Sequence, residues 1–160
     1  MSEGARPYRL LMVCTGNICR SPMAQGLAPW LAEQRGRVVH TRGGSTLGLD
    51  GNNADPNSVA VCAELGVDIA GHRASPISAA NIEWADFVLV MEYAHASHIR
   101  SHYGEVIGEK LFLLGNFGGV AEIADPIGGW RYQFRRTRDE IQRCVEAFLT
   151  RLPPLRTPDA

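Results

Sequence analysis

Cys14 and Arg20, two residues of complementary chemistry, lie close together in the segment 14–21, which reads CTGNICRS. A cysteine thiolate is a nucleophile, and the planar guanidinium group of arginine can bind two oxygens of one phosphate. Backbone N–H groups of a tight loop can converge on an anion. Ser21 adds a hydroxyl that can donate a hydrogen bond to the sulfur. These features predict a phosphate-binding loop with Cys14 as nucleophile; the alternative is a small apolar cysteine buried at a strand end.

The elements on either side of this segment should position it. The apolar run 10–13 is typical of a buried strand. Ser21 followed by Pro22 is typical of a helix start, with Ser21 as N-cap. This helix is expected to reach about Arg35, unless Pro29 kinks it or ends it early. Its N-terminus adds positive potential, so Cys14 is expected to be a thiolate at neutral pH.

A phosphate ester also needs an acid that protonates its leaving group, and two aspartates followed by proline could serve. Asp55 precedes a helical pattern that Gly66 ends, so it is expected to cap that helix. Asp125 precedes a loop with two glycines that can cover a pocket, so it is the better acid, with simple turn formation as the alternative. Cys14 would then form a phosphocysteine, and Asp125 would activate water to hydrolyse it.

Short apolar runs alternate with helical patterns along the rest of the chain. Further strands are expected at 38–41, 86–91 and 110–114, a Gly-rich loop at 43–53, and helices at 55–65, 93–102 and around 141–152. This alternation predicts an α/β fold with three layers: a parallel sheet of four strands with helices on both faces. The phosphate-binding loop follows the first strand. One domain is expected over residues 8–152, with flexible tails at 1–7 and 153–160.

Composition excludes several classes of protein. The 160 residues are 45% hydrophobic and 21% charged, which excludes a disordered chain, and a net charge of -1 leaves no strong field for nucleic acid or an anionic membrane. No apolar run approaches the ~20 residues that cross a bilayer, so a cytoplasmic protein is expected. Four cysteines without a C-x-x-C pair predict reduced thiols and no structural zinc site. The proposed chemistry requires neither a metal nor a cofactor, because Arg20 and the loop amides stabilise the phosphate oxygens.

The run 13–24, VCTGNICRSPMA, resembles the signature of the low-molecular-weight protein-tyrosine phosphatases. The resemblance continues through 55–56, 86–91 and 124–126 and covers essentially residues 8 to 152. It implies a four-stranded parallel sheet flanked by helices. It also implies Cys14 as nucleophile, Arg20 as phosphate clamp, Ser21 as stabiliser of the thiolate and Asp125 as general acid.

Several residues have expected supporting roles. The phosphate-binding set is Thr15, Gly16, Asn17, Ile18, Cys19, Arg20 and Ser21. Asn17 is expected to adopt the left-handed backbone conformation that asparagine tolerates. The resemblance implies that His72 supports the loop, although it could equally be a surface residue. It also implies a supporting serine after the second strand, where this chain has RGGS at 42–45; either Ser45 compensates or the loop is held differently.

The remaining cysteines, histidines and arginines have alternative interpretations. The resemblance implies that Cys19 forms a disulfide with Cys14 under oxidation, with loop packing as the alternative. Cys62 and Cys144 are expected in the core. The histidines at 95, 98 and 102 share a helical face with Glu92, and a solvated face is favoured over a zinc site. The arginines at 131, 135, 136 and 138 are expected on a helix surface that could attract an acidic phosphoprotein.

Two cues on the substrate conflict. Family members that act on phosphotyrosine usually have aromatic residues after the acid, whereas this chain has Ile127, two glycines and Trp130. The two glycines, Tyr132 and residues 137–140 resemble the protein-arginine phosphatase branch. That branch, however, has threonine in place of Ile18, which is the usual residue of the tyrosine-directed enzymes. We therefore predict a phosphotyrosine phosphatase whose substrate slot is formed by Ile18, Ile127 and Trp130, with phosphoarginine as the alternative.

Two further hypotheses use the same loop. An arsenate reductase of this fold needs further cysteines after the middle helix, and residues 72 to 100 contain none. A phosphocarrier or silent phosphate-binding module would lack an acid such as Asp125. The expected partners are a phosphorylated protein and a phosphate or similar oxyanion, and the chain is expected to be a monomer or weak dimer.

Overall fold

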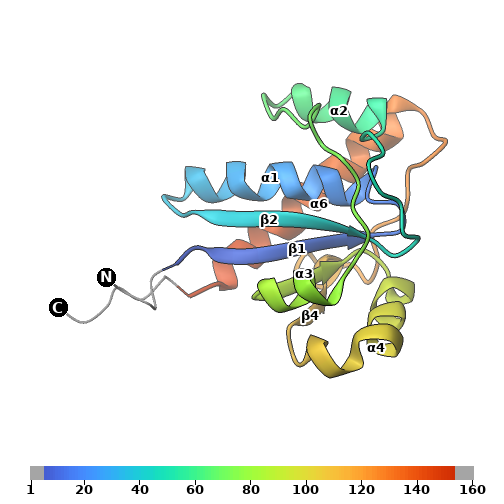
Figure 1. Cartoon of the computed structure of the whole chain (residues 1–160). Coiled ribbons are helices and arrows are strands. Elements are labelled where there is room, and N and C mark those ends of the chain that lie inside the picture. Colours follow the sequence, from blue (N-terminus) through green and yellow to red (C-terminus); the bar gives the residue numbers. More distant parts are fainter. Residues whose placement is uncertain (1–5, 154–160) are drawn as a thin grey trace.

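The structure is a computed structural model that describes residues 6–153. Its strands form one parallel sheet in the order β2-β1-β3-β4 (Figure 1), as predicted. The strands are β1 (Tyr8–Cys14), β2 (Val39–Ser45), β3 (Phe87–Val90) and β4 (Leu111–Leu113). The chain leaves β1 for β2 on one side and later adds β3 on the other side of β1. Ligands of open α/β sheets bind at such a reversal, beyond the carboxyl ends of the strands.

Helices cover both faces of the sheet, which confirms the three-layer α/β fold (Figure 1). The helices are α1 (Arg20–Gln34), α2 (Pro56–Ala63), α3 (Ala79–Trp84), α4 (Tyr93–Ile107), α5 (Leu114–Phe117) and α6 (Arg131–Arg151). Leu10 and Met12 of β1 belong to the core cluster shared with α1, α2 and α6. Leu11 and Val13 point to the other face and pack with residues of α3 and α4. Strand β1 is therefore buried on both sides, which its continuous apolar run indicated.

The first helix differs from its prediction in two respects. It begins at Arg20, with Cys19 rather than Ser21 as N-cap, and it runs past Pro29 to Gln34. A proline inside a helix leaves the carbonyl four residues earlier without its usual donor. Here Thr41 Oγ1 of β2 donates to that carbonyl, Gln25 O, at 2.9 Å. This contact satisfies the orphaned carbonyl and ties α1 to the sheet, so Pro29 does not end the helix.

Other elements also differ in extent. Gly43 and Gly44 belong to β2, so the expected loop at 43–53 begins only after Ser45. Helices α3 and α5 were not predicted, because six and four residues are too short to show a helical period. Helix α4 continues to Ile107 with a non-helical Tyr103 inside it. Asp55 caps α2 as predicted, since its carboxylate accepts the Asn57 N–H at 2.8 Å.

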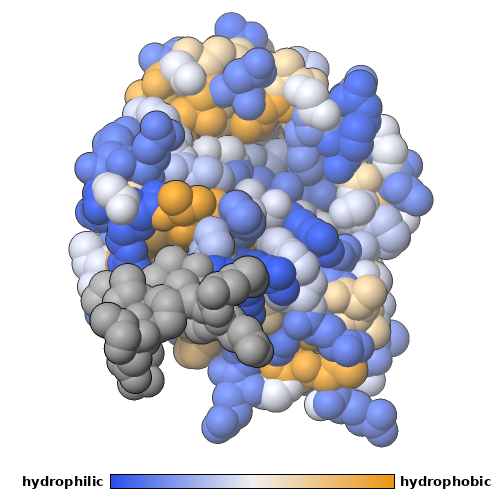
Figure 2. Space-filling view, turned by 60° about the vertical axis from the view of Figure 1, so that its left-hand side comes forward, coloured by the Kyte–Doolittle hydropathy of each residue, from blue (hydrophilic) through white to orange (hydrophobic). Residues whose placement is uncertain are grey.

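Of the tails predicted at 1–7 and 153–160, residues 1–5 and 154–160 lie outside the described part. Arg6 forms an ion pair with Asp86 at 2.8 Å, and Pro153 O accepts from Tyr8 Oη and Arg37 Nη2. Figure 2 shows apolar residues on one face as separate patches among polar ones. Within residues 6–153, no helix has the length and apolar character needed to cross a bilayer.

Candidate active site

The loop after β1 forms the floor of a cavity of about 110 Å³ at the carboxyl end of the sheet. The cavity brings together residues from three separate segments of the chain. Its lining consists of Cys14, Thr15, Gly16, Ile18, Cys19, Arg20, Leu47, Leu49, Asp125 and Ile127. The predicted nucleophile, phosphate clamp and acid therefore share one cavity, although Asp125 is far from the loop in sequence.

The sulfur of Cys14 lies between two hydrogen-bond donors. The Asn17 backbone N–H donates to Sγ at 3.2 Å, and the Ser21 hydroxyl lies 3.0 Å from Sγ. Because Ser21 Oγ also accepts from Asn17 Nδ2, its own hydrogen is left for the sulfur. Donors aimed at a sulfur favour its anionic form over the thiol. Ser21 therefore contacts the sulfur and does not cap the helix, because α1 has no side-chain cap.

Arg20 is held in place by the protein before any ligand binds. Its side chain is 1% exposed, and Nη1 donates to Ile123 O at 2.7 Å and to the Glu92 carboxylate. Nη2 lies 3.5 Å from Asp125 Oδ2. The Nε–H is buried and has no hydrogen-bond partner within the described residues. An unpartnered buried donor costs about 1–3 kcal/mol, so an anion that accepts from Nε would recover this energy.

Asn17 connects the loop to the segment that follows α2. It is fully buried and, among residues 6–153, is the one residue other than glycine with a positive φ, 54°. His72 Nε2 lies 2.7 Å from Asn17 O, which matches the support expected from His72. Burial lowers the pKa of His72, so the ring is neutral and can donate from Nε2. The Ser75 N–H donates to Asn17 Oδ1 at 3.1 Å.

Two serines support the loop: Ser45, which the sequence offered as a compensating residue, and Ser75, which it did not single out. Ser45 Oγ, at the end of β2, donates to Thr15 O at 2.7 Å and accepts from the Leu49 N–H. Ser75 Oγ donates to Gly43 O at 2.9 Å. Ser45 therefore contacts the loop directly. This agrees with the alternative in which Ser45 compensates for the serine that the family has after the second strand. Ser75 carries no local signal, because only the fold brings it to this place.

His95 lies inside the molecule and not on a solvated face, so that prediction was wrong for this residue. It is 2% exposed, and Nδ1 accepts the Glu92 N–H at 3.1 Å. The neutral ring then carries its hydrogen on Nε2, which lies 2.9 Å from Thr15 Oγ1. Burial first, then the charge of Arg20, lowers the pKa of His95 to about 4. Within the described part of the chain, no three His, Cys, Asp or Glu residues form a metal-binding group.

The buried His95 predicts a specific dependence of stability on pH. Unfolded His95 binds a proton below about pH 6.5, whereas the folded residue binds one only near pH 4. The unfolded state therefore holds more protons in this window, and the free energy of unfolding should rise as pH increases from 4 to 6.5. The contribution is at most about 3–4 kcal/mol, since one pKa unit corresponds to about 1.4 kcal/mol.

Urea unfolding across this pH window would measure the effect. His95→Gln should flatten the rise, because the variant lacks the titrating group. His40→Gln is the matched control, since His40 is exposed in β2 and should leave the rise unchanged. Equal slopes for wild type and His95→Gln would contradict this prediction.

The arginines of α6 do not all lie on the surface. Arg138 is 7% exposed and donates to Val61 O and to Glu64, both at 2.7 Å. Arg135 also bonds Glu64, and these contacts lower the pKa of Glu64 to about 2, with Arg135 as the largest cause. The pair therefore ties α6 to α2, whereas Arg136 is exposed as predicted.

The other cysteines lie in apolar surroundings. Cys62 and Cys144 are fully buried, as predicted. Burial raises the pKa of Cys62 and of Cys19 to about 12, so both are protonated thiols at neutral pH. Cys19 lies beside Cys14 in the cavity lining, and both are free.

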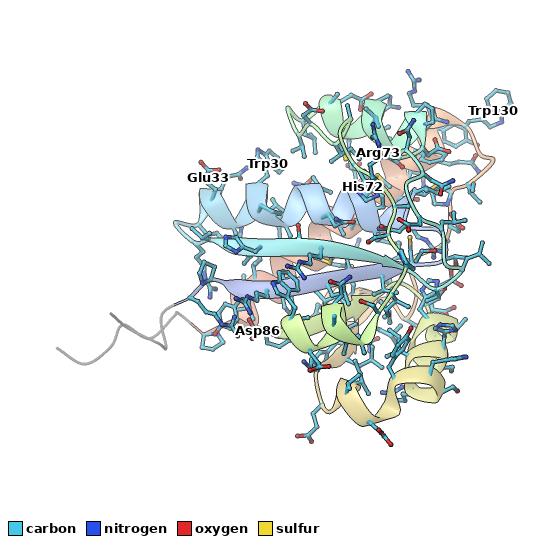
Figure 3. All side chains as sticks on the ribbon, viewed as in Figure 1. Trp30, Glu33, His72, Arg73, Asp86 and Trp130 are labelled. Atoms are coloured by element: carbon cyan, nitrogen blue, oxygen red, sulfur yellow. The ribbon has the colours of Figure 1, made fainter. Side chains whose placement is uncertain are left out.

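The mouth of the cavity is aliphatic. Ile18 and Ile127 line it, as expected for a substrate slot, together with Leu47 and Leu49, which the sequence analysis missed. Trp130 is not part of this lining: it is 75% exposed and extends away from the body of the molecule (Figure 3). A helical or strand period could not identify Leu47 and Leu49, because they lie in an irregular loop.

Asp125 is placed where it could exchange a proton with a bound group. Its carboxylate is 33% exposed, lies in the cavity lining and faces Arg20. Its other oxygen accepts the Ile127 N–H at 3.1 Å, so the residue also forms the turn that its sequence indicated. The site combines a sulfur that faces two hydrogen-bond donors with a buried guanidinium group and a carboxylate. These groups can act as nucleophile, phosphate-binding cation and proton donor in a displacement at phosphorus.

Comparisons with known proteins agree with this chemistry. The family model described as low molecular weight phosphotyrosine protein phosphatase matches residues 9–155. A protein-arginine-phosphatase of Geobacillus stearothermophilus is 35% identical over 91% of this chain and 97% of its own. A probable low molecular weight protein-tyrosine-phosphatase, EpsP, of Ralstonia nicotianae is 37% identical over 91% of this chain and 97% of its own.

Comparison with solved structures also identifies similar low molecular weight phosphatases. The crystal structure of a low molecular weight protein tyrosine phosphatase from T. tengcongensis superposes with a TM-score of 0.85. It is 31% identical, with 91% of this chain and 99% of that chain covered. Sequence and fold thus agree over nearly the whole length of both proteins, and the chain belongs to the low molecular weight phosphotyrosine protein phosphatase family of hydrolases.

Proposed function

We propose that this chain hydrolyses phosphotyrosine in proteins through a phosphocysteine intermediate, with Cys14 as nucleophile, Arg20 as phosphate clamp and Asp125 as general acid. The observation that carries the proposal is the buried Arg20, whose Nε–H has no partner among residues 6–153. It faces the same cavity as a sulfur that accepts from Asn17 N–H and contacts the Ser21 hydroxyl. Such a site is prepared for a tetrahedral anion placed against a nucleophile.

The reaction proceeds in two displacements at phosphorus. In the first, Cys14 Sγ forms the S–P bond while the bond from phosphorus to the tyrosyl oxygen breaks, and Asp125 gives its proton to that oxygen. In the second, the Asp125 carboxylate takes a proton from water as the water oxygen attacks phosphorus. The P–S bond breaks, Cys14 leaves as a thiolate and phosphate is released. Arg20 and the amides of loop 15–20 hold the equatorial oxygens throughout.

The aliphatic side chains at the cavity mouth favour a substrate in which an uncharged ring carries the phosphate. Ile18, Leu47, Leu49 and Ile127 provide apolar contacts on the walls, and Asp125 is the one carboxylate in the lining. A phenyl ring is stabilised by such walls, whereas a guanidinium group loses water there and has little to replace it. The second candidate is phosphoarginine, which the glycines after Ile127 and the relatives named protein-arginine-phosphatase favour.

Phosphate release from matched phosphotyrosine and phosphoarginine peptides, with Cys14→Ser as blank, tests the proposal. We expect kcat/KM to favour phosphotyrosine by about tenfold or more, which corresponds to about 1.4 kcal/mol of wall contacts. Ile18→Thr should move the ratio toward phosphoarginine, because it removes apolar contact and adds a hydroxyl. A preference for phosphoarginine in the wild type would reverse the choice of substrate. Release from neither peptide would favour a carrier or binding module.

The proposal extends to the setting of the reaction. All site residues come from one chain, so a monomer or weak dimer suffices for activity. A thiolate nucleophile requires reducing conditions, which favour the cytoplasm. The partner is a phosphorylated protein, and phosphate or a similar oxyanion would occupy the loop.

A further inference from the structure

Gly43 of β2 and Gln25 of α1 occupy adjoining space, such that a side chain at position 43 would overlap Gln25. A Cβ atom on Gly43 would lie 2.1 Å from Gln25 Oε1 and 2.4 Å from Asn17 Nδ2. Both distances are far below any non-bonded contact, so a residue with a side chain at 43 would displace both the Gln25 and the Asn17 amides. The glycine is required here by close approach and not by its backbone angles, since its φ is not positive.

The Gln25 side chain uses this space to contact the loop. Its Oε1 accepts from Asn17 Nδ2 at 3.0 Å. The two hydrogens of that amide nitrogen are therefore both used, one on Gln25 and one on Ser21, while Ser75 N–H donates to the amide oxygen. Thr41 Oγ1 fixes Gln25 from the other side by donating to its backbone carbonyl. A series of direct contacts thus runs from β2 through Gln25 and Asn17 to the sulfur of Cys14.

We propose that Gln25 is a positioning residue for the phosphatase reaction and that Gly43 is the glycine that admits it. The proposal rests on the function proposed above. Gln25 touches neither the sulfur nor the phosphate cavity; it acts through Asn17, whose N–H must point at Sγ from a left-handed conformation. Gly43 therefore leaves open the space in which the Gln25 and Asn17 amides meet, and a side chain at 43 would overlap both.

Gln25→Ala should loosen Asn17 and, through it, both donors on the sulfur. One hydrogen of a fully buried amide loses its acceptor, so the Asn17 side chain and the Ser21 hydroxyl can reorient. We expect kcat to fall by about tenfold, in line with the effect of displacing a positioned group by less than 1 Å. KM should change little, because Arg20 and the loop amides still bind the phosphate. The rate of alkylation of Cys14 by iodoacetate at neutral pH should fall, because the Asn17 N–H and the Ser21 hydroxyl no longer hold the sulfur as firmly.

A conservative variant separates the contact with Asn17 from a packing role. In Gln25→Glu, a carboxylate oxygen can still accept from Asn17 Nδ2, so kcat and the rate of Cys14 alkylation should stay near wild type. Gly43→Ser should lower both, because its Cβ would overlap the Gln25 and Asn17 amides. Gln34→Ala is the matched control, since Gln34 is the exposed last residue of the same helix and should change neither quantity. Thermal unfolding of each variant establishes that it is folded.

Two results would overturn the proposal. One is a folded Gln25→Ala protein with the kcat and alkylation rate of the wild type. The other is a folded Gln25→Glu protein as impaired as Gln25→Ala. If Gly43→Ser fails to fold, the two Gln25 variants decide the question. Failure of the proposed function is distinguishable, because Cys14 of a wild type that releases no phosphate is still alkylated at a measurable rate, and Gln25→Ala must still lower that rate.

Discussion

Cys14→Ser will abolish phosphate release, with a fall in kcat of about 10⁴-fold or more, as expected when a covalent nucleophile is removed. Serine has nearly the same shape, and its hydroxyl can still contact Ser21 and the Asn17 N–H. These two donors stabilise a sulfur anion, but they do not make an alkoxide accessible at neutral pH. Within residues 6–153, no base is hydrogen-bonded to the Cys14 side chain either, since its partners are the Asn17 N–H and a hydroxyl. The variant should therefore keep the cavity and lose the reaction.

Steady-state kinetics with a phosphotyrosine peptide measures this loss, and binding of inorganic phosphate by calorimetry shows that the cavity survives. Cys144→Ala is the matched control: it also removes a buried thiol, but in α6 beside Gly115 and away from the cavity lining. It should keep turnover close to that of the wild type. A Cys14→Ser protein within about tenfold of wild-type kcat would rule out the phosphocysteine route, because loss of the nucleophile must cost far more than that.

The parts of this molecule that local sequence determines were predictable. The loop 14–21 holds the sulfur, the guanidinium and the serine hydroxyl within one continuous segment, so their meeting required only a strand before and a helix after. Strand β1 was identifiable because both its faces are buried and its residues are apolar without interruption. The cap at Asp55 followed from the preference of aspartate before proline at a helix start.

The parts that depend on tertiary contacts were not predictable. Pro29 predicts a break in α1 by local rules, but the helix continues, and Thr41 of a neighbouring strand donates to the carbonyl that the proline leaves free. By local rules, glycines at 43 and 44 predict a loop. They lie in strand β2 instead, because the sheet pairs them with β1 and the Gln25 side chain fills the space beside Gly43. Ser75 and Gln25 reach the loop from other segments, so nothing beside them in sequence indicates their contacts.

The environment of His95 was only partly predictable from the sequence. The spacing of Glu92 and His95 fits a capping contact at the start of α4, and in the structure the Glu92 N–H donates to His95 Nδ1. That signal was present in the sequence, but the regular spacing of three histidines suggested one common environment. In the fold, the first is buried against Thr15 while His98 and His102 stack on each other with ring centres 4.3 Å apart. Residues on one face of a helix can therefore differ in burial within two turns, as the buried His95 and the exposed His102 do.

Asp125→Asn should lower kcat by about 10²–10⁴-fold on a phosphotyrosine peptide, which is the usual contribution of a general acid. The tyrosyl oxygen leaves as a poor anion unless it receives a proton, and the amide group of the variant has none to give. The substitution preserves the local fold, because an asparagine oxygen still accepts the Ile127 N–H that Asp125 accepts now. It also removes a negative charge 3.5 Å from Arg20, so binding of the phosphate should be unchanged or tighter.

The dependence on the leaving group separates an acid from a structural role. A substrate whose leaving group is already stable as an anion, such as p-nitrophenyl phosphate, should lose far less than the peptide in its first step, measured as the burst of p-nitrophenol. Asp55→Asn is the matched control: it is the other aspartate before proline, and asparagine caps a helix as well as aspartate does. That variant should leave both substrates near wild type. If Asp125→Asn slowed both substrates equally, Asp125 would act by shaping the cavity mouth, and the proton would have to reach the tyrosyl oxygen from another group.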